Sequence, residues 1–246
     1  MGSKERQDRE RQAVTDSILD AARELLLAEG YQSVSIRKIA ERIEYSPAAI
    51  YSYYPSKDDI FLALAKEGFH RLDAKVHDAM GTGDALDDVR ACWWAFYQFS
   101  KEQPEYFLLM FVDRSVPRIT QQWEGFEFLQ QLLNNAVAGI QKAIDAGAFP
   151  ATLSANAAMH MLWAGLIGPA VVGIRHRLAT GEDYDALARD VLNAAIAGMQ
   201  AGVATTFVSC KCADPSTVLR VIPSLSRDEE GIAGASVPAG ATRHET

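Results

Sequence analysis

Apolar residues recur every three or four positions from about residue 14 to residue 207, the spacing expected of amphipathic helices. The first of these segments runs from Val14 to Glu29 and stops at Gly30, and no segment shows the alternating, β-branched pattern of a strand. The pattern therefore predicts an all-α protein of about nine helices. Beyond two short helices near the start, the expected segments are 57–79, 84–102, 104–111, 120–146, 154–179 and 183–207.

The two short helices lie within residues 33–61 and are separated by a sharp turn. Ser35 and Ser46 each stand before an apolar or proline-led helix start, where a hydroxyl can cap the first free N–H groups. Only three residues separate the helices, which forces them to cross steeply, and Ile50 with Tyr51 is expected to anchor the second helix against the first. This is the pattern of a helix-turn-helix, whose second helix can enter the DNA major groove.

The order VSIRKIAERI followed by SPAAIYSYYPSKDDIF resembles the N-terminal domain of the tetracycline-repressor (TetR/AcrR) family of bacterial transcription regulators. The resemblance covers about residues 14–64. It departs from the family at Ile43 and Glu44, where a small residue and a glycine are usual, and at Ala48, which is often glycine. If Glu44 adopts a left-handed conformation, its Cβ atom carries a modest penalty.

The resemblance implies which residues contact DNA. Arg37 matches a position that reaches a base edge or phosphate, and Tyr53 and Lys57 match phosphate-contacting positions. Tyr45 either reaches the DNA or packs against the first helix. Two serines act first as helix caps, and three small residues at the start of the recognition helix offer only apolar contact, for example to thymine methyl groups. The predicted DNA-binding set is Ser35, Arg37, Tyr45, Ser46, Pro47, Ala48, Ala49, Tyr53 and Lys57.

Charge and composition divide the chain into four expected regions. The net charge of −8 arises outside residues 1–57, which hold nine basic and nine acidic residues, so it does not exclude DNA binding. We expect a flexible N-terminal arm at 1–12, which either contacts DNA or is a solvated leader. A helix-turn-helix domain at 13–56, a helical ligand-binding and dimerisation domain at 57–207 and a disordered tail at 208–246 follow.

The C-terminal domain is rich in aromatic residues and methionine, which are either an ordinary helical core or the wall of the effector cavity that the family resemblance implies. Candidate polar groups are Asp113, Arg114, Gln122 and Asn156, together with His160, which is more often a satisfied core residue. The predicted ligand-binding set is Trp93, Tyr97, Phe107, Met110, Phe111, Trp123, Phe126, Met159, His160 and Trp163. The expected ligand is a small apolar or aromatic effector.

The last two predicted helices carry small and apolar residues on one face, and in the resembled family such helices join two subunits. The resemblance therefore implies a homodimer with two recognition helices set for successive major grooves of a pseudopalindromic operator. The residues concerned are Ala157, Ala158, Met161, Leu162, Gly165 and Leu166 on one helix, and Leu187, Val191, Leu192, Ala195, Ile196 and Met199 on the other.

Other classes of function lack supporting motifs. We find no phosphate-binding loop, nucleophile elbow or metal-ligand spacing, and Cys210 and Cys212 have no nearby partner ligands, so we expect neither an enzyme nor a cofactor or metal. The sequence shows no leader peptide or long membrane-spanning run, and its three cysteines fit a reducing cytoplasm. Three hypotheses remain: a ligand-responsive repressor, a DNA-binding regulator without an effector, and a helical ligand-binding protein or enzyme with a vestigial helix-turn-helix.

Overall fold

The computed structural model describes residues 3–113, 127–174 and 181–202, and within them the protein is all-α. Nine α-helices and one short 3-10 helix account for the regular structure of these residues. The chain divides into two units, residues 1–209 and 210–246, and every helix described below belongs to the first.

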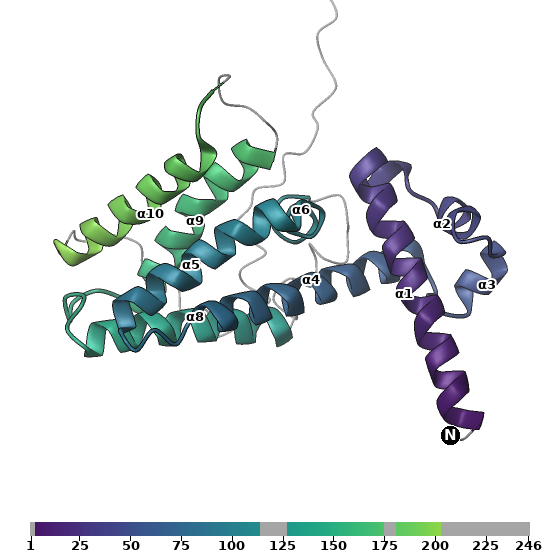
Figure 1. Cartoon of the computed structure of the whole chain (residues 1–246), viewed down its shortest axis with the longest axis horizontal. Helices are drawn as coiled ribbons and strands as arrows, with labels where there is room; N and C mark the ends of the chain where they lie inside the picture. The colour runs from purple at the N-terminus through teal and green to yellow at the C-terminus, as the bar shows by residue number, and fades with distance from the viewer. Residues whose placement is uncertain (1–2, 114–126, 175–180, 203–246) are drawn as a thin grey trace, which may run out of the picture. The chain divides into compact units, whose positions relative to one another are not determined.

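The N-terminal part is a three-helix unit. Helix α1 spans Ser3–Glu29, α2 spans Ile36–Arg42 and α3 spans Pro47–Tyr51, with a 3-10 turn at Tyr31–Ser33. Helix α2 packs against α1, and α3 packs against α2 (Figure 1). Ile18, Ile39 and Ile50 are fully buried between them. The predicted helix-turn-helix is therefore present, with the boundaries that its capping residues indicate.

Helix α1 begins much earlier than the sequence pattern predicts. Residues 3–12, expected to form a flexible arm, continue the helix without apolar support. Side chains one turn apart stabilise this exposed segment: Arg6 pairs with Glu10 at 2.8 Å, and Gln12 donates to Asp16 at 2.8 Å. Such pairs favour a helix without burying any surface, which is why apolar periodicity did not reveal it.

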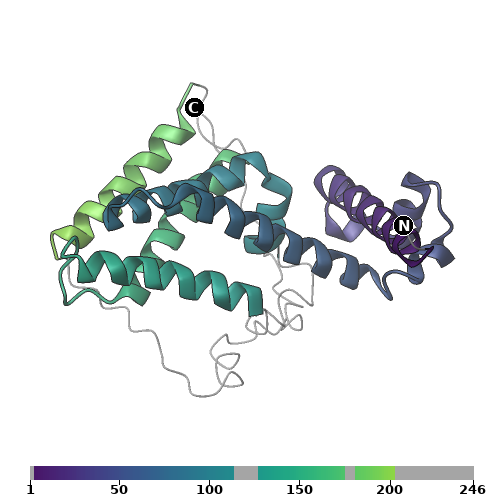
Figure 2. The ribbon, with the colours of Figure 1, turned by 60° about the horizontal axis from the view of Figure 1, so that its bottom comes forward.

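The remaining helices form a bundle around an aromatic core. They are α4 (Lys57–Ala79), α5 (Ala85–Glu102), α6 (Pro104–Phe111), α8 (Glu127–Asp145), α9 (Ala155–Ile174) and α10 (Tyr184–Gln200). Helix α5 packs against α4, α8 and α9, and α8 also lies beside α4 (Figure 2). Helix α9 lies alongside α10 (Figure 1). Because α4 also packs on α1, this one helix belongs both to the bundle and to the support of the N-terminal unit.

Helix α9 is apolar on nearly all sides. It continues through Gly168 and Pro169. Its most apolar segment has a mean hydropathy of 1.6, and among the described helices it alone is long and apolar enough to cross a membrane. Core helices of globular proteins pass the same test, but only 39% of its most apolar segment is buried. Among the described residues, the uncovered part of α9 consists of Met161, Ala164 and Gly168, which are exposed.

Candidate DNA-binding surface and ligand cavity

The turn between α2 and α3 is built by a Schellman motif. Tyr45 N–H donates to Ala40 C=O at 2.9 Å and Glu44 N–H donates to Glu41 C=O at 3.4 Å, so the last carbonyls of α2 are satisfied. This geometry requires a left-handed residue, and Glu44 has φ = 59°, the one positive φ at a non-glycine position among the described residues. The expected strain at Glu44 is thus present in the structure.

Serine caps fix the start of both short helices and of α4. Ser35 Oγ accepts from Lys38 N–H at 3.2 Å, and Ser46 Oγ accepts from Ala49 N–H at 3.2 Å. Ser56 Oγ accepts from Asp59 N–H at 3.3 Å and donates to the Asp59 carboxylate at 2.7 Å. The capping roles predicted for Ser35 and Ser46 are confirmed, while DNA contact by these residues stays a prediction.

The outer face of α2 and α3 presents aromatic and basic side chains. Tyr45 is 44% exposed and Tyr51 is 56% exposed. The expectation that Tyr51 anchors α3 in the core is wrong; Ile50 alone does so, at 0% exposure. Arg37 is exposed and pairs with Glu41 at 2.7 Å, and this hydrogen bond raises the pKa of the guanidinium. On α3, Pro47 and Ala48 are exposed, and Ala49 is half-buried.

Lys57 holds the N-terminal unit together. Its Nζ donates to the carbonyls of Tyr31 and Val34, each at 3.0 Å, and stands 3.9 Å from the centre of the Tyr31 ring. The Tyr31 hydroxyl in turn donates a short hydrogen bond to Asp58. Burial, and then this carboxylate, raise the pKa of Tyr31. Lys57 therefore has a structural role that the sequence did not reveal, in addition to the phosphate contact predicted for it.

Arg11 is a basic residue of α1 that the sequence placed only in the arm. Its guanidinium lies 4.9 Å from the centre of the Tyr53 ring and donates to Ser52 C=O at 3.4 Å. Tyr53 is half-buried, so its ring supports this arginine beside the end of α3. The structure thus adds a positive charge next to the predicted phosphate-contacting tyrosine.

A cavity of about 470 Å³ lies among α4, α5, α6, α8 and α9. Its wall is mainly apolar and includes an aromatic group of Trp93, Phe96, Phe111 and Trp163. Phe111 joins the wall residues of α5 and α9, since its ring centre lies 5.4 Å from that of Phe96 and 6.5 Å from that of Trp163. A volume of this size and an apolar wall are typical of small-molecule sites.

Few polar groups reach the cavity. Asp73 and His77 come from α4, Asp88 from α5, and Asn135 and Lys142 from α8. Hydrogen bonds from Thr82 and from Gly81 N–H lower the pKa of Asp88, with a smaller contribution from the Lys142 charge.

Cys92 also lines the cavity, and burial raises the pKa of its thiol to about 12. The thiol is therefore neutral at physiological pH and adds to the apolar wall.

The structure brings together three of the predicted ligand-binding residues, Trp93, Phe111 and Trp163. Other members of the predicted set are not in this wall, because tertiary packing uses them elsewhere. Phe107, Met110 and Met159 are buried core residues. The Tyr97 hydroxyl donates to Asp185 at 2.9 Å and so joins α5 to α10.

The predicted polar groups are also elsewhere. His160 Nδ1 donates to Asn156 C=O at 2.9 Å within α9, and neither residue lines the cavity. Asp113 instead lines a groove between α1 and α6. Trp123, Phe126, Arg114 and Gln122, together with Cys210, Cys212 and the tail, lie outside the described residues. Sequence reasoning missed Phe96, whose spacing from Trp93 placed it on the same helix face.

Comparisons with known proteins agree with this geometry. The model of the bacterial regulatory proteins of the tetR family matches residues 18–64. An uncharacterised helix-turn-helix transcriptional regulator, YdeS from Bacillus subtilis, is 27% identical over 77% of this chain and 91% of its own length. The repressor KstR from Mycolicibacterium smegmatis is 35% identical over 27% of this chain and 32% of its own.

A solved structure extends the similarity in fold to most of the bundle. FadR from Bacillus subtilis, determined in complex with stearoyl-CoA, superimposes with a TM-score of 0.63 over 74% of this chain and 97% of that one. The sequence identity is 18%, so the likeness concerns the fold alone. The matched segment includes the helix-turn-helix, and the likeness in fold covers about three quarters of the chain.

Proposed function

The chain belongs to the TetR family of bacterial transcription regulators, and on that premise we propose that it is a homodimeric repressor released from its operator by a small apolar or aromatic effector. The observation that carries this proposal is the course of α4. Its first residue, Lys57, bonds to the N-terminal unit, and two later residues, Leu72 and Val76, line the cavity. A ligand that favours one position of α4 therefore also favours one position of the recognition helices.

DNA binding is proposed for the exposed face of α2 and α3. The recognition helix has only five residues, and its small exposed side chains allow a close approach to the base edges. Hydrogen-bonded readout then falls to Tyr45, Tyr51 and Arg37 at the edges of this face. Tyr53, Arg11 and the N-terminus of α4 with Lys57 are proposed to hold phosphates. The partner is double-stranded DNA, which places the protein in the cytoplasm.

The effector is proposed to bind in the cavity among α4, α5, α6, α8 and α9. Its four aromatic side chains suit a planar or chain-like apolar body, and two of the polar groups, His77 and Lys142, lie in the last turns of α4 and α8. The similar FadR structure holds stearoyl-CoA, so fatty acids and their thioesters are the first ligands to screen, followed by planar aromatic compounds.

The homodimer is proposed to form through α9 and α10. Several residues first expected at the interface, among them Leu162, Leu192 and Ile196, are instead buried within the subunit. The exposed residues of the same helix pair include apolar or small ones, namely Met161, Ala164 and Gly168 on α9 and Leu187, Ala194 and Ala197 on α10, beside the exposed polar residues Asp190, Asn193 and Gln200 of α10. A second copy would bury this surface and the uncovered part of α9 across a two-fold axis.

Two experiments separate this proposal from its alternatives. A gel shift against the DNA upstream of the protein's own gene tests for a regulator, and absence of any sequence-specific shift would favour a ligand-binding protein with a vestigial helix-turn-helix. Thermal-shift screening against hydrophobic compounds then tests for an effector. A protein that shifts DNA but that no compound stabilises or releases would be a regulator without a small-molecule effector.

A further inference from the structure

Helix α6 gives the cavity a second contact with the N-terminal unit, in addition to that of α4. It is eight residues long and carries Phe111, a wall residue of the cavity, at its last position. At its first turn, Glu105 and Tyr106 face α1, and Arg23 of α1 reaches both. A rigid helix of this length can pass a displacement at one end directly to the other.

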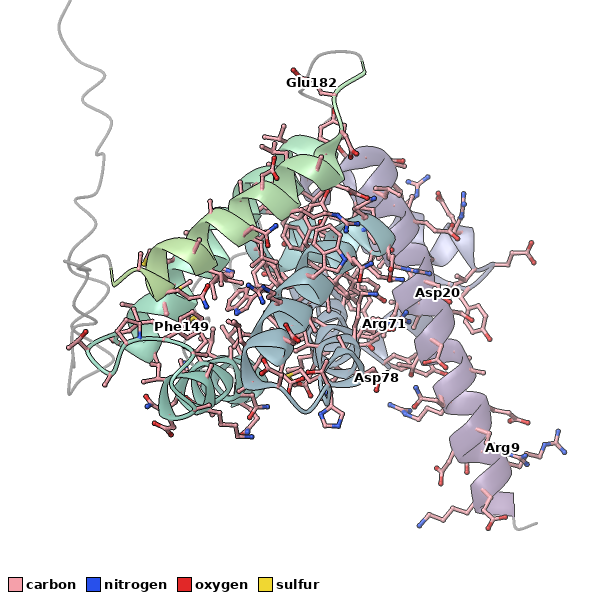
Figure 3. The ribbon with its side chains drawn as sticks, turned by 60° about the vertical axis from the view of Figure 1, so that its left-hand side comes forward. Arg9, Asp20, Arg71, Asp78, Phe149 and Glu182 are labelled. Carbon is pink, nitrogen blue, oxygen red and sulfur yellow. The ribbon has the colours of Figure 1, made fainter. Side chains whose placement is uncertain are left out.

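The contact between α1 and α6 is electrostatic and half-buried. Arg23 Nη1 donates to Glu105 at 3.5 Å, and the relative exposure of the two side chains is 29% and 12%. The Arg23 guanidinium also lies 5.8 Å from the centre of the Tyr106 ring. Arg71 of α4 approaches the same ring at 5.2 Å (Figure 3 labels Arg71 on α4 and Asp20 on α1). Tyr106 is thus contacted by an arginine from each of two helices.

Arg23 is incompletely satisfied in this position of α6. Its Nη2 donates to Asp20 at 2.8 Å, but its bond to Glu105 is at the limit of hydrogen-bond length. Its Nε is buried and has no acceptor among the described residues. The Nη1 bond to Glu105 has no margin in length, so a small shift of α6 changes the strength of this contact considerably. Such sensitivity to position is what a coupling contact requires.

The α4–α6 packing is tight enough that the two helices move together. A Cβ atom on Gly68 would lie 2.5 Å from Met110 Sδ and 2.9 Å from Tyr106 Cδ1. The same helix pair is joined near the cavity by Phe69 and Phe111, whose ring centres are 5.9 Å apart. If a ligand displaces Phe111, α6 is therefore displaced with it, and the contacts of α6 with α4 and α1 change as well.

We propose that Arg23 is a positioning residue that transmits occupancy of the cavity to the DNA-binding unit, because its guanidinium ties α1 to the first turn of α6. The inference rests on the proposed function and adds a named contact to it. Arg23 is not itself a DNA-contacting or ligand-contacting residue in this scheme. Its loss should weaken the coupling between the two sites, which is a free energy separate from either affinity.

The role of Arg23 can be tested before any effector is known, by a substitution that places a side chain in the cavity. Gly139 lies on α8 in the cavity wall, and a Cβ atom there would meet nothing within 4 Å. Gly139→Phe places a ring in the cavity, and Gly139→Ala is its matched control with a similar gain in helix propensity. Affinity is measured for a DNA fragment selected in vitro by the wild-type protein. The ratio of the DNA dissociation constants of Gly139→Phe and Gly139→Ala measures the coupling between the cavity and the DNA-binding unit.

We expect Gly139→Phe to bind this DNA about tenfold more weakly than Gly139→Ala, and the ratio to fall to about threefold or less when Arg23→Met is added to both. Arg42→Met is the control for lost charge, because Arg42 pairs with Glu24 of α1 at 2.6 Å and joins α1 to α2 rather than to α6. With Arg42→Met the ratio should stay near ten. Circular-dichroism melts verify folding, and Glu105→Gln replaces Arg23→Met if that variant does not fold.

The outcomes separate the two proposals. An unchanged ratio with Arg23→Met and with Glu105→Gln would overturn the role of Arg23 while leaving the regulator intact. Equal affinities of Gly139→Phe and Gly139→Ala would mean that the cavity is not coupled to DNA, which removes both the effector and the relay. If the protein selects no DNA fragment, the proposed function itself is wrong, and the inference fails with it.

Discussion

At the scale of single residues, Glu44 is the clearest strained position of the helix-turn-helix. Its left-handed backbone is required by the Schellman turn, but its Cβ atom makes that conformation unfavourable. Glu44→Gly should therefore raise the free energy of unfolding by about 0.5–1 kcal/mol, a shift in melting temperature of about 1–4 °C. Glu44→Ala removes the same charge and retains the strain, so calorimetry should show no comparable gain. Equal melting temperatures for the two variants would contradict this account.

Lys57 should affect stability as well as DNA binding. Its two bonds to carbonyls and its contact with the Tyr31 ring are lost in Lys57→Ala, which should lower the free energy of unfolding by about 1–3 kcal/mol. Urea denaturation measures this loss. Arg37→Ala is the comparison, because Arg37 is 81% exposed and its pairing with Glu41 adds little to stability. Similar denaturation midpoints for Lys57→Ala and the wild type would leave phosphate contact as its main role.

Ile50 and Tyr51 are neighbours with opposite exposure, and their variants should separate folding from recognition. Tyr51→Ala should weaken DNA binding about tenfold or more while changing stability by less than about 1 kcal/mol, because its ring is exposed. Ile50→Ala should cost about 2–4 kcal/mol of stability, because its side chain is fully buried. Fluorescence-anisotropy titrations and thermal melts of both proteins provide the test. Full DNA affinity in Tyr51→Ala would exclude it from the interface.

At the scale of helices, the parts that follow local rules could be predicted from sequence. The starts of α2, α3 and α4 follow from Ser35, Ser46 and Ser56, because a cap depends on bonds to residues three positions away. The start of α1 was missed because its first turns are supported by charged pairs instead of burial. The orientation of Tyr51 was missed because a five-residue helix is too short for periodicity to define its buried face.

Membership of the cavity wall depends on packing between helices that are distant in sequence. Trp93 and Trp163 both line the cavity, while contact of either residue with a ligand stays a prediction. Tyr97 is one turn from Trp93, but its hydroxyl bonds to Asp185 of α10, a residue 88 positions away. Composition alone gives no indication of which aromatic side chain faces the cavity and which faces a neighbouring helix.

The wall formed by α9 can be tested with a matched tryptophan pair. Trp163→Ala should weaken the effector's release of DNA about tenfold or more by removing apolar contact area, while DNA affinity without ligand stays nearly unchanged. Trp94 is also half-buried but packs against Arg189, whose guanidinium lies 4.4 Å from its ring. Trp94→Ala should leave the response intact. The measurement is DNA affinity against concentration of any compound found by thermal-shift screening.

Stability must be measured in both tryptophan variants, because a large-to-small change in a packed region costs about 3–5 kcal/mol. A fall in melting temperature of similar size in both, with a lost response only in Trp163→Ala, supports contact with the ligand. If Trp94→Ala and Trp163→Ala lose the response equally, the loss reflects general destabilisation. In that case Trp163 stabilises the fold and does not contact the ligand.

At the scale of the whole molecule, the charge distribution fits a protein that binds DNA at one end only. Residues 1–57 are balanced, with nine basic and nine acidic side chains, and the net −8 comes from the rest of the chain. The acidic bundle is expected to be repelled by the phosphates, so it favours orientations in which the helix-turn-helix approaches first. In a homodimer, this effect would apply to both recognition helices together.

The dimer itself can be tested at the exposed apolar surface of α9 and α10. Met161 and Leu187 are each 37% exposed, and Met161→Arg with Leu187→Arg would place unpaired charges in the proposed interface. A buried charge without a partner costs about 3–5 kcal/mol, so the dimer dissociation constant should rise by about two to three orders of magnitude. Leu27→Arg is the control for an added charge at an exposed apolar residue: Leu27 is 61% exposed on α1, where it lines a hollow with Ile174 and Tyr184 at the ends of α9 and α10, and it is not part of the proposed interface.

Size-exclusion chromatography with light scattering should show a monomer for the double variant and a dimer for Leu27→Arg at micromolar concentration. Affinity for a two-half-site DNA should fall with the dimer, because a monomer loses the effective concentration that links its two recognition helices. Binding to a single half-site should be unchanged, which separates loss of assembly from loss of folding. A double variant that remains dimeric would show that this surface is covered in another way, and the two-fold arrangement proposed for the recognition helices would then have to rest on other contacts.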